Sequence, residues 1–331
     1  MTEIRNDWTK EEISEIYNSP LLDLIYRSAT VHRENKDYSE VQISSLLSIK
    51  TGGCSEDCSY CPQAARYNTG LEVQALMSLE QVTFAAQKAK DGGASRLCMG
   101  AAWREVRDNR DFDKVIEMVK TVNSMDMEVC CTLGMLTESQ AQRLADAGLY
   151  AYNHNLDTSE EDYKRIITTR TYDDRLKTIE NVRKAKLTVC SGGIIGLGET
   201  VEDRISMLKT LSNMPKHPES VPINALVPVK GTPMENQPPV PILDMVRMIA
   251  TARIIMPKTV VRLSAGRTQM SLTDQALCFM AGANSIFAGD KLLTTPNPEF
   301  NEDMQMFEIL GLKPREAFKN GRPAVRETVE L

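Results

Sequence analysis

A (β/α)8 barrel is the fold that this 331-residue sequence predicts. Short runs rich in β-branched residues alternate with helical stretches about eight times over roughly 250 residues, the pattern of such a barrel. The chain is 42% hydrophobic, which is enough for one large domain with a sizeable core. A doubly wound parallel sheet is the alternative fold.

The chain is expected to have three parts. Residues 1–40 form a helical N-terminal extension, because apolar residues recur at helix spacing between Leu21 and Ile25 and helical character covers 9–35. Residues 41–315 form the barrel. Residues 316–331 form a short polar C-terminal tail.

The expected strands are short runs bounded by turn residues, near 43–49, 94–99, 127–133, 149–154, 187–192, 220–227, 259–264 and 284–288. The helices between them are expected near 79–91, 111–124, 137–147, 173–186, 200–213, 241–256 and 271–281. Gly92-Gly93 marks a helix end, and Thr137 with Gln140 forms a capping-box pattern at a helix start. The proline-rich stretch 228–241 is expected to be a loop.

The composition narrows the class of protein and the cellular compartment. The charge is 39 − 45 = −6, and no basic run suggests binding to nucleic acid or an anionic membrane. The first residues contain no apolar region of a signal peptide, and no apolar run approaches the ~20 residues of a spanning helix. Eight cysteines in such a chain favour metal or redox chemistry in a reducing cytoplasm over disulfides.

Three of these cysteines, Cys54, Cys58 and Cys61, lie within eight residues and are spaced C-x3-C-x2-C. A structural zinc site needs four ligands, and no second close pair follows at the usual distance. Iron–sulfur clusters also bind thiolates from close runs, usually four of them. Three thiols therefore suggest a four-iron cluster with one iron left open to a small molecule.

The same spacing, with Tyr60 directly before the third cysteine, resembles that of the radical S-adenosylmethionine (SAM) enzymes. In that superfamily the open iron of a 4Fe-4S cluster chelates SAM, and one electron cleaves it to a 5′-deoxyadenosyl radical. The resemblance implies that Cys54, Cys58 and Cys61 bind this cluster. It does not indicate the substrate.

Strand alternation predicts a second group of polar side chains inside the barrel. The positions expected to point into one lumen are Cys98, Cys130, Cys190 and Arg262. Buried polar groups are costly unless something binds them, so these residues form either a polar plug or a second metal site. Cys131 and Cys278 are expected in the apolar core, although a one-residue bulge would exchange Cys130 with Cys131.

The expected fourth strand ends in polar residues. Asn153, Asn155 and Asp157 share one phase, which we interpret as inward, and His154 has the opposite phase. Amides and a carboxylate at a barrel mouth suit ribose hydroxyls or a urea-like substrate. The alternative is that these are only turn-forming residues. With three histidines in the chain, no pattern indicates a histidine base or ligand.

Together these stretches resemble the biotin synthase family, from about Pro20 to Pro298. Beyond the cysteine run, the resemblance is carried by Cys98–Arg104, Tyr152–Thr158, Val189–Gly193, Val221–Asn224, Val261–Arg267 and Leu292–Pro298. It implies a homodimeric (β/α)8 barrel that inserts sulfur into dethiobiotin to form biotin. A 2Fe-2S cluster would be the sulfur donor and would be rebuilt between turnovers.

The resemblance also implies roles for individual residues. The ligands of the 2Fe-2S cluster would be Cys98, Cys130, Cys190 and Arg262. The residues in contact with SAM would be Tyr60, Ala101, Asn155, Asp157, Arg175 and Ile194. Dethiobiotin would be bound by Asn155, Asn224, Thr294 and Thr295. No residue is expected to act as an acid or a base.

The partners implied are a flavodoxin-type electron donor and iron–sulfur cluster assembly proteins. One rival is a lipoyl synthase-like sulfur inserter, whose family carries another cysteine run near its N-terminus. Residues 1–53 contain no cysteine, which argues against it. A second rival is a non-catalytic iron–sulfur sensor, which predicts one closed site and no SAM binding.

Overall fold

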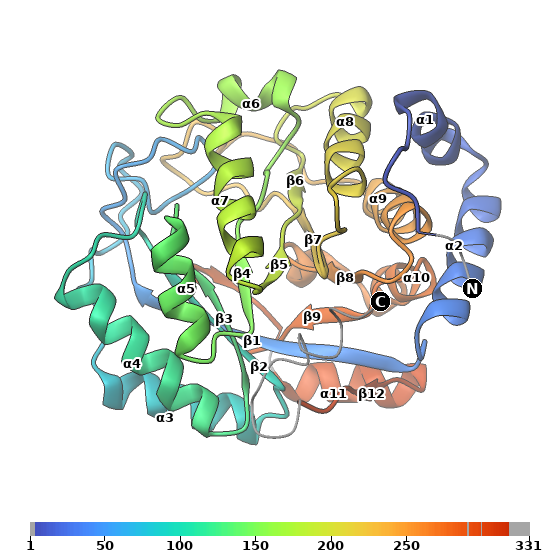
Figure 1. The fold of residues 1–331 in the computed structure, drawn as a ribbon. Coiled ribbons are helices and arrows are strands. Elements are labelled where there is room, and N and C mark those ends of the chain that lie inside the picture. The colour runs from blue at the N-terminus through green and yellow to red at the C-terminus, as the bar shows by residue number, and fades with distance from the viewer. Residues whose placement is uncertain (1–3, 290, 299, 318–331) are drawn as a thin grey trace.

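The computed structural model describes residues 4–289, 291–298 and 300–317, and it confirms the predicted barrel. Eight parallel strands close on themselves, because β9 pairs with both β8 and β1 (Figure 1). In the order of the closed sheet these strands are β1 (Glu40–Lys50), β2 (Arg96–Ala101), β3 (Glu128–Thr132), β4 (Ala151–Asn153), β5 (Thr188–Cys190), β7 (Ser220–Ala225), β8 (Val260–Leu263) and β9 (Ser285–Phe287).

Helices alternate with the strands and cover the outside of the barrel (Figure 1). They are α3 (Leu79–Asp91), α4 (Arg110–Ser124), α5 (Glu138–Asp146), α6 (Glu160–Ile166), α7 (Tyr172–Lys184), α8 (Val201–Ser212), α9 (Ile242–Ile255), α10 (Leu272–Met280) and α11 (Phe300–Leu310). Thr137 and Gln140 form the predicted capping box at the start of α5, and Gly92 caps the end of α3. The sequence patterns gave no expectation of α6 or α11.

The N-terminal segment folds as two helices, α1 (Lys10–Asn18) and α2 (Leu21–Asn35), rather than as one helical stretch. Pro20 separates them because a proline lacks the N–H that a continuous helix requires. α2 packs on α9, and α1 packs on α8 and α9. Arg247 of α9 donates to the carbonyls of Tyr17 at 2.7 Å and Ser19 at 2.9 Å, so the break itself is fastened to the barrel.

The predicted fifth strand is interrupted, and the chain resumes as β6 (Gly193–Ile195), which also pairs with β7. The break lies opposite Pro222, which has no N–H to donate to the strand ladder. A Cβ at Gly192 would collide with the carbonyl of Pro222, and one at Gly193 would collide with Met207. Glycine at these positions therefore lets the backbone turn inward at the barrel mouth.

Three further strands lie outside the closed barrel: β10 (Lys291–Leu292), β11 (Thr295–Pro296) and β12 (Lys313–Pro314). β10 and β11 form a small antiparallel hairpin after β9. β12 pairs in parallel with the first two residues of β1. Residues 318–331, most of the predicted tail, lie outside the described residues.

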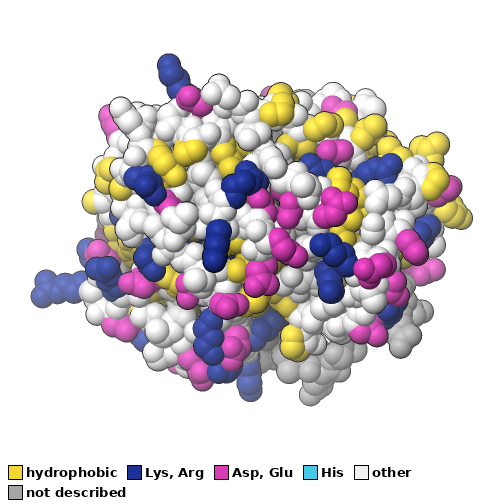
Figure 2. Space-filling model, turned by 90° about the horizontal axis from the view of Figure 1, so that it is seen from above, with side chains coloured by type: hydrophobic (Ala, Val, Ile, Leu, Met, Phe, Trp, Pro, Cys, Tyr) yellow, Lys and Arg dark blue, Asp and Glu magenta, His cyan; other side chains and the backbone are white. Residues whose placement is uncertain are grey.

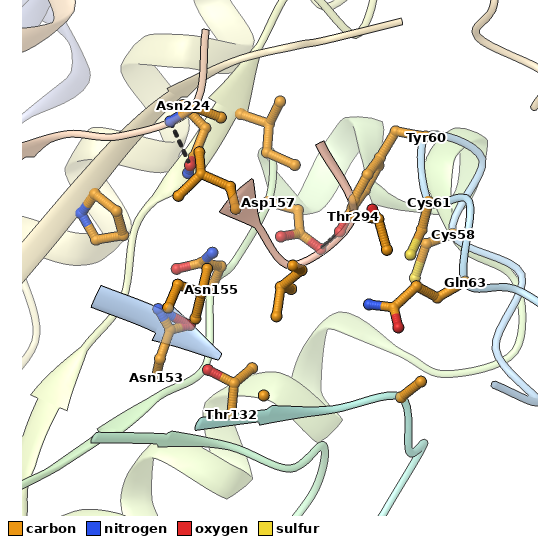
Figure 3. Close-up of a pocket in the computed structure, with 18 of the residues that line it drawn as sticks. Cys58, Tyr60, Cys61, Gln63, Thr132, Asn153, Asn155, Asp157, Asn224 and Thr294 are labelled. Atoms are coloured by element: carbon orange, nitrogen blue, oxygen red, sulfur yellow. Dashed lines mark hydrogen bonds between the residues drawn. The ribbon is translucent and has the colours of Figure 1, made fainter. Parts of the chain in front are cut away.

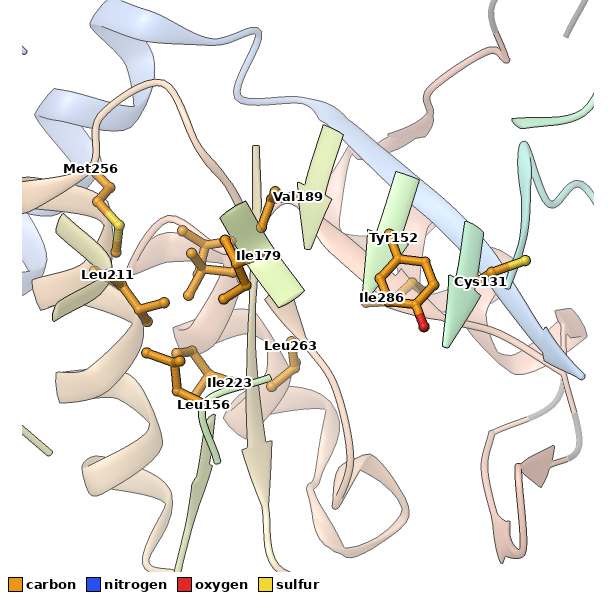
Figure 4. Close-up of a cluster of buried hydrophobic side chains, with 14 of the residues drawn as sticks. Cys131, Tyr152, Leu156, Ile179, Val189, Leu211, Ile223, Met256, Leu263 and Ile286 are labelled. Carbon is orange, nitrogen blue, oxygen red and sulfur yellow. The ribbon is translucent and has the colours of Figure 1, made fainter. Parts of the chain in front are cut away.

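The main hydrophobic core lies between the strands and the helices. Cys131 and Tyr152 point into this outer core from adjacent strands (Figure 4). Cys278 is buried there as well, on α10. A separate small cluster fills part of the lumen and contains Cys98 and Cys130. The predicted inward phase of Cys130 and outward phase of Cys131 are thus confirmed.

Charges of both signs are intermixed on the face shown in Figure 2, and the coloured residues there form no broad patch of one sign. Within the described part of the chain, no helix is both long and apolar enough to cross a bilayer.

Candidate active site at the carboxyl end of the barrel

A cavity of about 340 Å³ opens at the carboxyl ends of the strands, where barrels of this type carry their chemistry. It brings together predicted site residues from eight separate segments of the chain, several of which are labelled in Figure 3. Those that border it are Cys54, Cys58, Tyr60, Cys61, Cys98, Ala101, Cys130, Asn155, Asp157, Arg175, Ile194, Asn224, Thr294 and Thr295. Cys190 and Arg262 lie deeper in the lumen, both 0% exposed.

The cysteine loop follows β1 and is fixed from one side by Asp57. One oxygen of this buried carboxylate accepts from the backbone N–H of Thr168 at 2.8 Å and of Thr169 at 3.2 Å. The other accepts from Arg66 at 2.9 Å. These bonds lower the pKa of Asp57 to about 2, against the raising effect of its burial. The loop is therefore held in place before any metal binds.

The three thiols of the loop line the cavity side by side with Gln63, and Figure 3 shows Cys58 and Cys61 facing it together. A turn between them is closed by the Cys61 N–H, which donates to the Cys58 carbonyl at 2.9 Å. Burial raises the pKa of Cys58 to about 11 and that of Cys61 to about 12. Both are thus protonated at neutral pH, and metal binding must displace their protons.

No set of three or more His, Cys, Asp or Glu side chains within the described residues is arranged to hold a single metal ion. Three thiols on one loop, beside a cavity whose border also carries polar side chains, are a donor set suited to a four-iron cluster.

Tyr60 and Arg175 meet at Asp157. The Tyr60 hydroxyl donates to the Asp157 carboxylate at 2.8 Å, and the Arg175 guanidinium forms a buried ion pair with the same oxygen. Arg175 also donates to the Asn155 carbonyl at 2.7 Å and to the Tyr163 hydroxyl at 2.8 Å. Three of the predicted SAM contacts are therefore bonded to one another.

The amides at the cavity are also fixed by backbone bonds. Asn155 accepts from the Gly192 N–H at 3.2 Å, and Asn224 donates to the Gly193 carbonyl at 2.9 Å. Because Asn224 also accepts from the Ala265 N–H at 3.4 Å, its orientation is set from two sides. The inward backbone of 192–193 is therefore what positions both side chains.

The second group of thiols lies below this cavity. Cys98 and Cys130 are register partners on β2 and β3, and both are almost fully buried. The bond to Cys98, together with burial, raises the pKa of Cys130. Burial would raise the pKa of Cys98 as well, but the bond from Cys130 and the charge of Arg262 lower it to about 7. Cys190 accepts from Asn153 at 3.5 Å. One thiol of this group is thus predisposed to bind metal as a thiolate.

Arg262 completes the second group. Its Nη1 lies 4.0 Å from the Cys190 sulfur, and its Nε donates to Ser285 at 2.9 Å. Within the described residues it forms no salt bridge, although it is fully buried. A buried guanidinium whose bonds go to neutral groups and a thiol suits an anionic group nearby.

Two residues of the site, Arg170 and Gln63, were not anticipated. Arg170 borders the cavity between Glu56 and Cys58, with its Nη2 4.0 Å from the Cys58 sulfur. Gln63 accepts from the Gly52 N–H at 3.1 Å and closes the cysteine loop. His154 stacks beside Tyr152 on the outward side, as its phase predicts, but still borders the cavity. The polar run Thr168-Thr169-Arg170 between two helices was the available signal for Arg170.

Comparisons with known proteins agree with this geometry. The model of the Radical SAM superfamily matches residues 48–211, and that of the Biotin and Thiamin Synthesis associated domain matches 222–313. The solved structure of methylornithine synthase superposes with a TM-score of 0.79 at 18% identity, covering 93% of this chain and 94% of that one. The structure of the FeFe-hydrogenase maturase of Carboxydothermus hydrogenoformans superposes with a TM-score of 0.81 at 17% sequence identity. The match covers 95% of this chain and 77% of that one. The barrel, its cysteine loop and the family match define a radical SAM enzyme.

Curated relatives specify the family. Biotin synthase of Cytophaga hutchinsonii is 71% identical over 97% of this chain and 95% of its own. Biotin synthase of Christiangramia forsetii is 68% identical over 96% of this chain and 87% of its own length. The mitochondrial biotin synthase of Arabidopsis thaliana is 61% identical over 94% of this chain and 82% of its own length. The chain belongs to the biotin synthase family.

Proposed function

We propose that this enzyme inserts sulfur into dethiobiotin to form biotin. The observation that carries the proposal is the presence of two separate thiol groups on one barrel axis: the cysteine loop beside the cavity, and the inward cysteines beneath it. A single cluster would need only the first group. Membership of the biotin synthase family supports the same reaction.

Two iron–sulfur clusters would occupy these groups. Cys54, Cys58 and Cys61 would hold a 4Fe-4S cluster whose fourth iron binds SAM. The second, a 2Fe-2S cluster, would be held by Cys98, Cys130, Cys190 and Arg262. When bound, the first supplies the electron that cleaves SAM, and the second supplies sulfur.

The polar residues of the cavity would bind SAM. Tyr60 would lie against the adenine, with backbone at Ala101 and Ile194 completing that contact. The Asp157 carboxylate would accept hydrogen bonds from the ribose hydroxyls, and the Asn155 amide would accept or donate them. Because Arg175 already pairs with Asp157, the methionyl carboxylate would join an existing ion pair rather than find an isolated guanidinium.

Dethiobiotin would lie between SAM and the second thiol group. The amides of Asn155 and Asn224 match a ureido ring, which has both donors and acceptors. Thr294 and Thr295, in the β10–β11 hairpin above the cavity, would bind the carboxylate at the other end. The chain's own residues thus position the substrate carbons and exclude water, and none acts as an acid or a base.

The remaining partners are proposals from the same family membership. The enzyme would act as a homodimer in the cytoplasm. A flavodoxin-type protein would deliver the electron, and iron–sulfur cluster assembly proteins would rebuild the second cluster.

An anaerobic assay tests the reaction. Reconstituted protein is given dithionite, SAM and dethiobiotin, and the products are measured by mass spectrometry. The proposal expects biotin with about two 5′-deoxyadenosines for each, since two carbons must be activated. Deoxyadenosine without biotin would reject the substrate, and neither product would reject the radical chemistry.

A further inference from the structure

A second and much smaller cavity lies at the amino end of the barrel, below the inward thiols. Its volume is about 20 Å³, and it is bordered by residues near the starts of the strands and by Arg315, which follows β12. Cys190 borders this lower cavity, whereas Cys98 and Cys130 border the upper one. The second thiol group therefore separates two hollow spaces.

A chain of hydrogen bonds crosses the lower end of the lumen and reaches Arg262. The Arg262 Nη2 donates to Gln42 Oε1 at 3.2 Å, and Gln42 Nε2 donates to Glu128 at 3.0 Å. The same carboxylate accepts from Arg96 at 2.7 Å and from Arg315 at 2.8 Å. Since Glu128 is 0% exposed, Arg96 and Arg315 supply the positive charge that its burial requires.

Arg315 differs from the other members of this chain because it lies outside the closed barrel. It is carried by the two-residue strand β12, which lies beside the start of β1 (Figure 1). The Lys313 N–H donates to Ser39 at 2.8 Å and the Arg315 N–H donates to Val41 at 2.9 Å. The ion pair of Lys313 with Asp37 is about half exposed and contributes little.

These contacts make the floor of the lower cavity weaker than its walls. The walls are barrel strands bonded on both sides, whereas the described part of the floor is the two-residue edge strand β12 with the Arg315 side chain that follows it. Segments held by few bonds open locally at a lower free energy than the strands of a closed sheet. Arg315 can therefore leave Glu128 while the barrel stays intact, because Arg96 still pairs with that carboxylate.

We propose that Arg315 closes a second entrance to the inward thiol site, through which iron and inorganic sulfide reach it from the amino end of the barrel. The inference rests on the proposed function, in which sulfur leaves the second cluster and has to be replaced. The upper route passes the residues assigned to SAM and dethiobiotin. The lower route leads to Cys190 without passing them.

The test measures access to each cluster in the reconstituted holoenzyme. Wild type, Arg315→Ala and Lys313→Ala are incubated anaerobically with EDTA, and loss of each cluster is followed by Mössbauer spectroscopy, which separates the two types. Loss of the bond to Glu128 is expected to speed removal of the two-iron cluster about tenfold in Arg315→Ala. The four-iron cluster, at the far end of the barrel, should be unaffected. Lys313→Ala, a cation removed from the same strand, should match wild type.

A second variant separates opening of the floor from a disturbed charge. Arg315→Gln removes the positive charge but keeps a side chain that can donate a hydrogen bond to Glu128, so it should lose the two-iron cluster more slowly than Arg315→Ala. Equal rates in Arg315→Ala and wild type would overturn the proposal. So would equal acceleration for both clusters, because that reports general loosening. A wild-type protein that assembles no two-iron cluster would instead overturn the proposed function.

Discussion

The Tyr60 hydroxyl donates to the Asp157 carboxylate at 2.8 Å and so joins the cysteine loop to the end of the fourth strand. Tyr60 directly precedes a thiol of the first group, and Asp157 follows β4 across the cavity. Asp157 itself has φ of 69°, a left-handed backbone that non-glycine residues rarely adopt. The bonds from Tyr60 and Arg175 hold it there, and the cavity wall is thereby built from two distant segments.

This bond gives a first prediction. Tyr60→Phe keeps the ring but removes the hydroxyl, so Asp157 becomes less well positioned and the Kd for SAM should rise about tenfold. Tyr67→Phe is the matched control, since the Tyr67 hydroxyl is bonded at 2.6 Å to the Asp57 carbonyl in the same loop. Isothermal titration of SAM measures both variants. If both variants lost affinity for SAM equally, the Tyr60 hydroxyl would act by stabilising the cysteine loop as a whole and not by positioning Asp157.

The adjacent Cys130 and Cys131 provide an internal comparison for the second metal site. Cys130→Ala should abolish the two-iron cluster and biotin formation while leaving some SAM cleavage. Cys131→Ala should keep the cluster and lose only about 1 kcal/mol of stability, because that thiol packs in the outer core. Iron content and visible absorption distinguish the outcomes. Retention of the cluster in Cys130→Ala would contradict the ligand assignment.

The first cluster is tested by Cys54→Ala. Without this thiol the open-iron cluster should not assemble, and 5′-deoxyadenosine should fall to background. Cys278→Ala removes a buried thiol from α10 and serves as the control for the loss of a cysteine. Normal deoxyadenosine formation by Cys54→Ala would reject the role of the C-x3-C-x2-C run.

Asn224 is predicted to recognise the substrate rather than SAM. Asn224→Ala removes the amide that is fixed between Gly193 and Ala265. The KM for dethiobiotin should rise about tenfold, and the Kd for SAM should change less than twofold. An equal effect on both ligands would place Asn224 in the framework of the cavity instead.

His32 predicts how stability depends on pH. It is buried on α2, and burial, with the nearby charge of Arg253, lowers its pKa from 6.5 to about 3. Below pH 6.5 the unfolded chain binds a proton here that the folded chain does not, so stability falls as pH falls towards 3. Each pH unit in this window costs up to ~1.4 kcal/mol.

His32→Gln removes this titration. In urea unfolding at about pH 7.5 and about pH 5, wild type should lose ~2 kcal/mol more than the variant does. Parallel losses in the two proteins would mean that His32 binds its proton equally well in both states.

Much of this arrangement could be predicted from the sequence because it depends on periodicity. Alternation along β3 was sufficient to place Cys130 inward and Cys131 outward. The spacing of strands and helices was sufficient for the closed barrel. These features follow from the local geometry of a strand, which requires no knowledge of its partners.

Features that depend on distant contacts could not be predicted. Arg170 reaches Cys58 only because Asp57 fastens the loop to Thr168 and Thr169, more than a hundred residues later. The interruption after Cys190 results from Pro222 on the neighbouring strand. Likewise, the contact of Arg315 with Glu128 depends on β12 returning to the start of β1, and a two-residue strand has no periodicity to detect.

The measurement that tests the central claim most directly follows the sulfur. The second cluster is reconstituted with isotopically labelled sulfide, free sulfide is removed, and one turnover is run with SAM and dethiobiotin. If the thiol group of Cys98, Cys130, Cys190 and Arg262 holds the sulfur donor, biotin carries the label in proportion to the labelling of that cluster. Unlabelled biotin, or equally labelled biotin from Cys190→Ser, would show that the sulfur comes from elsewhere.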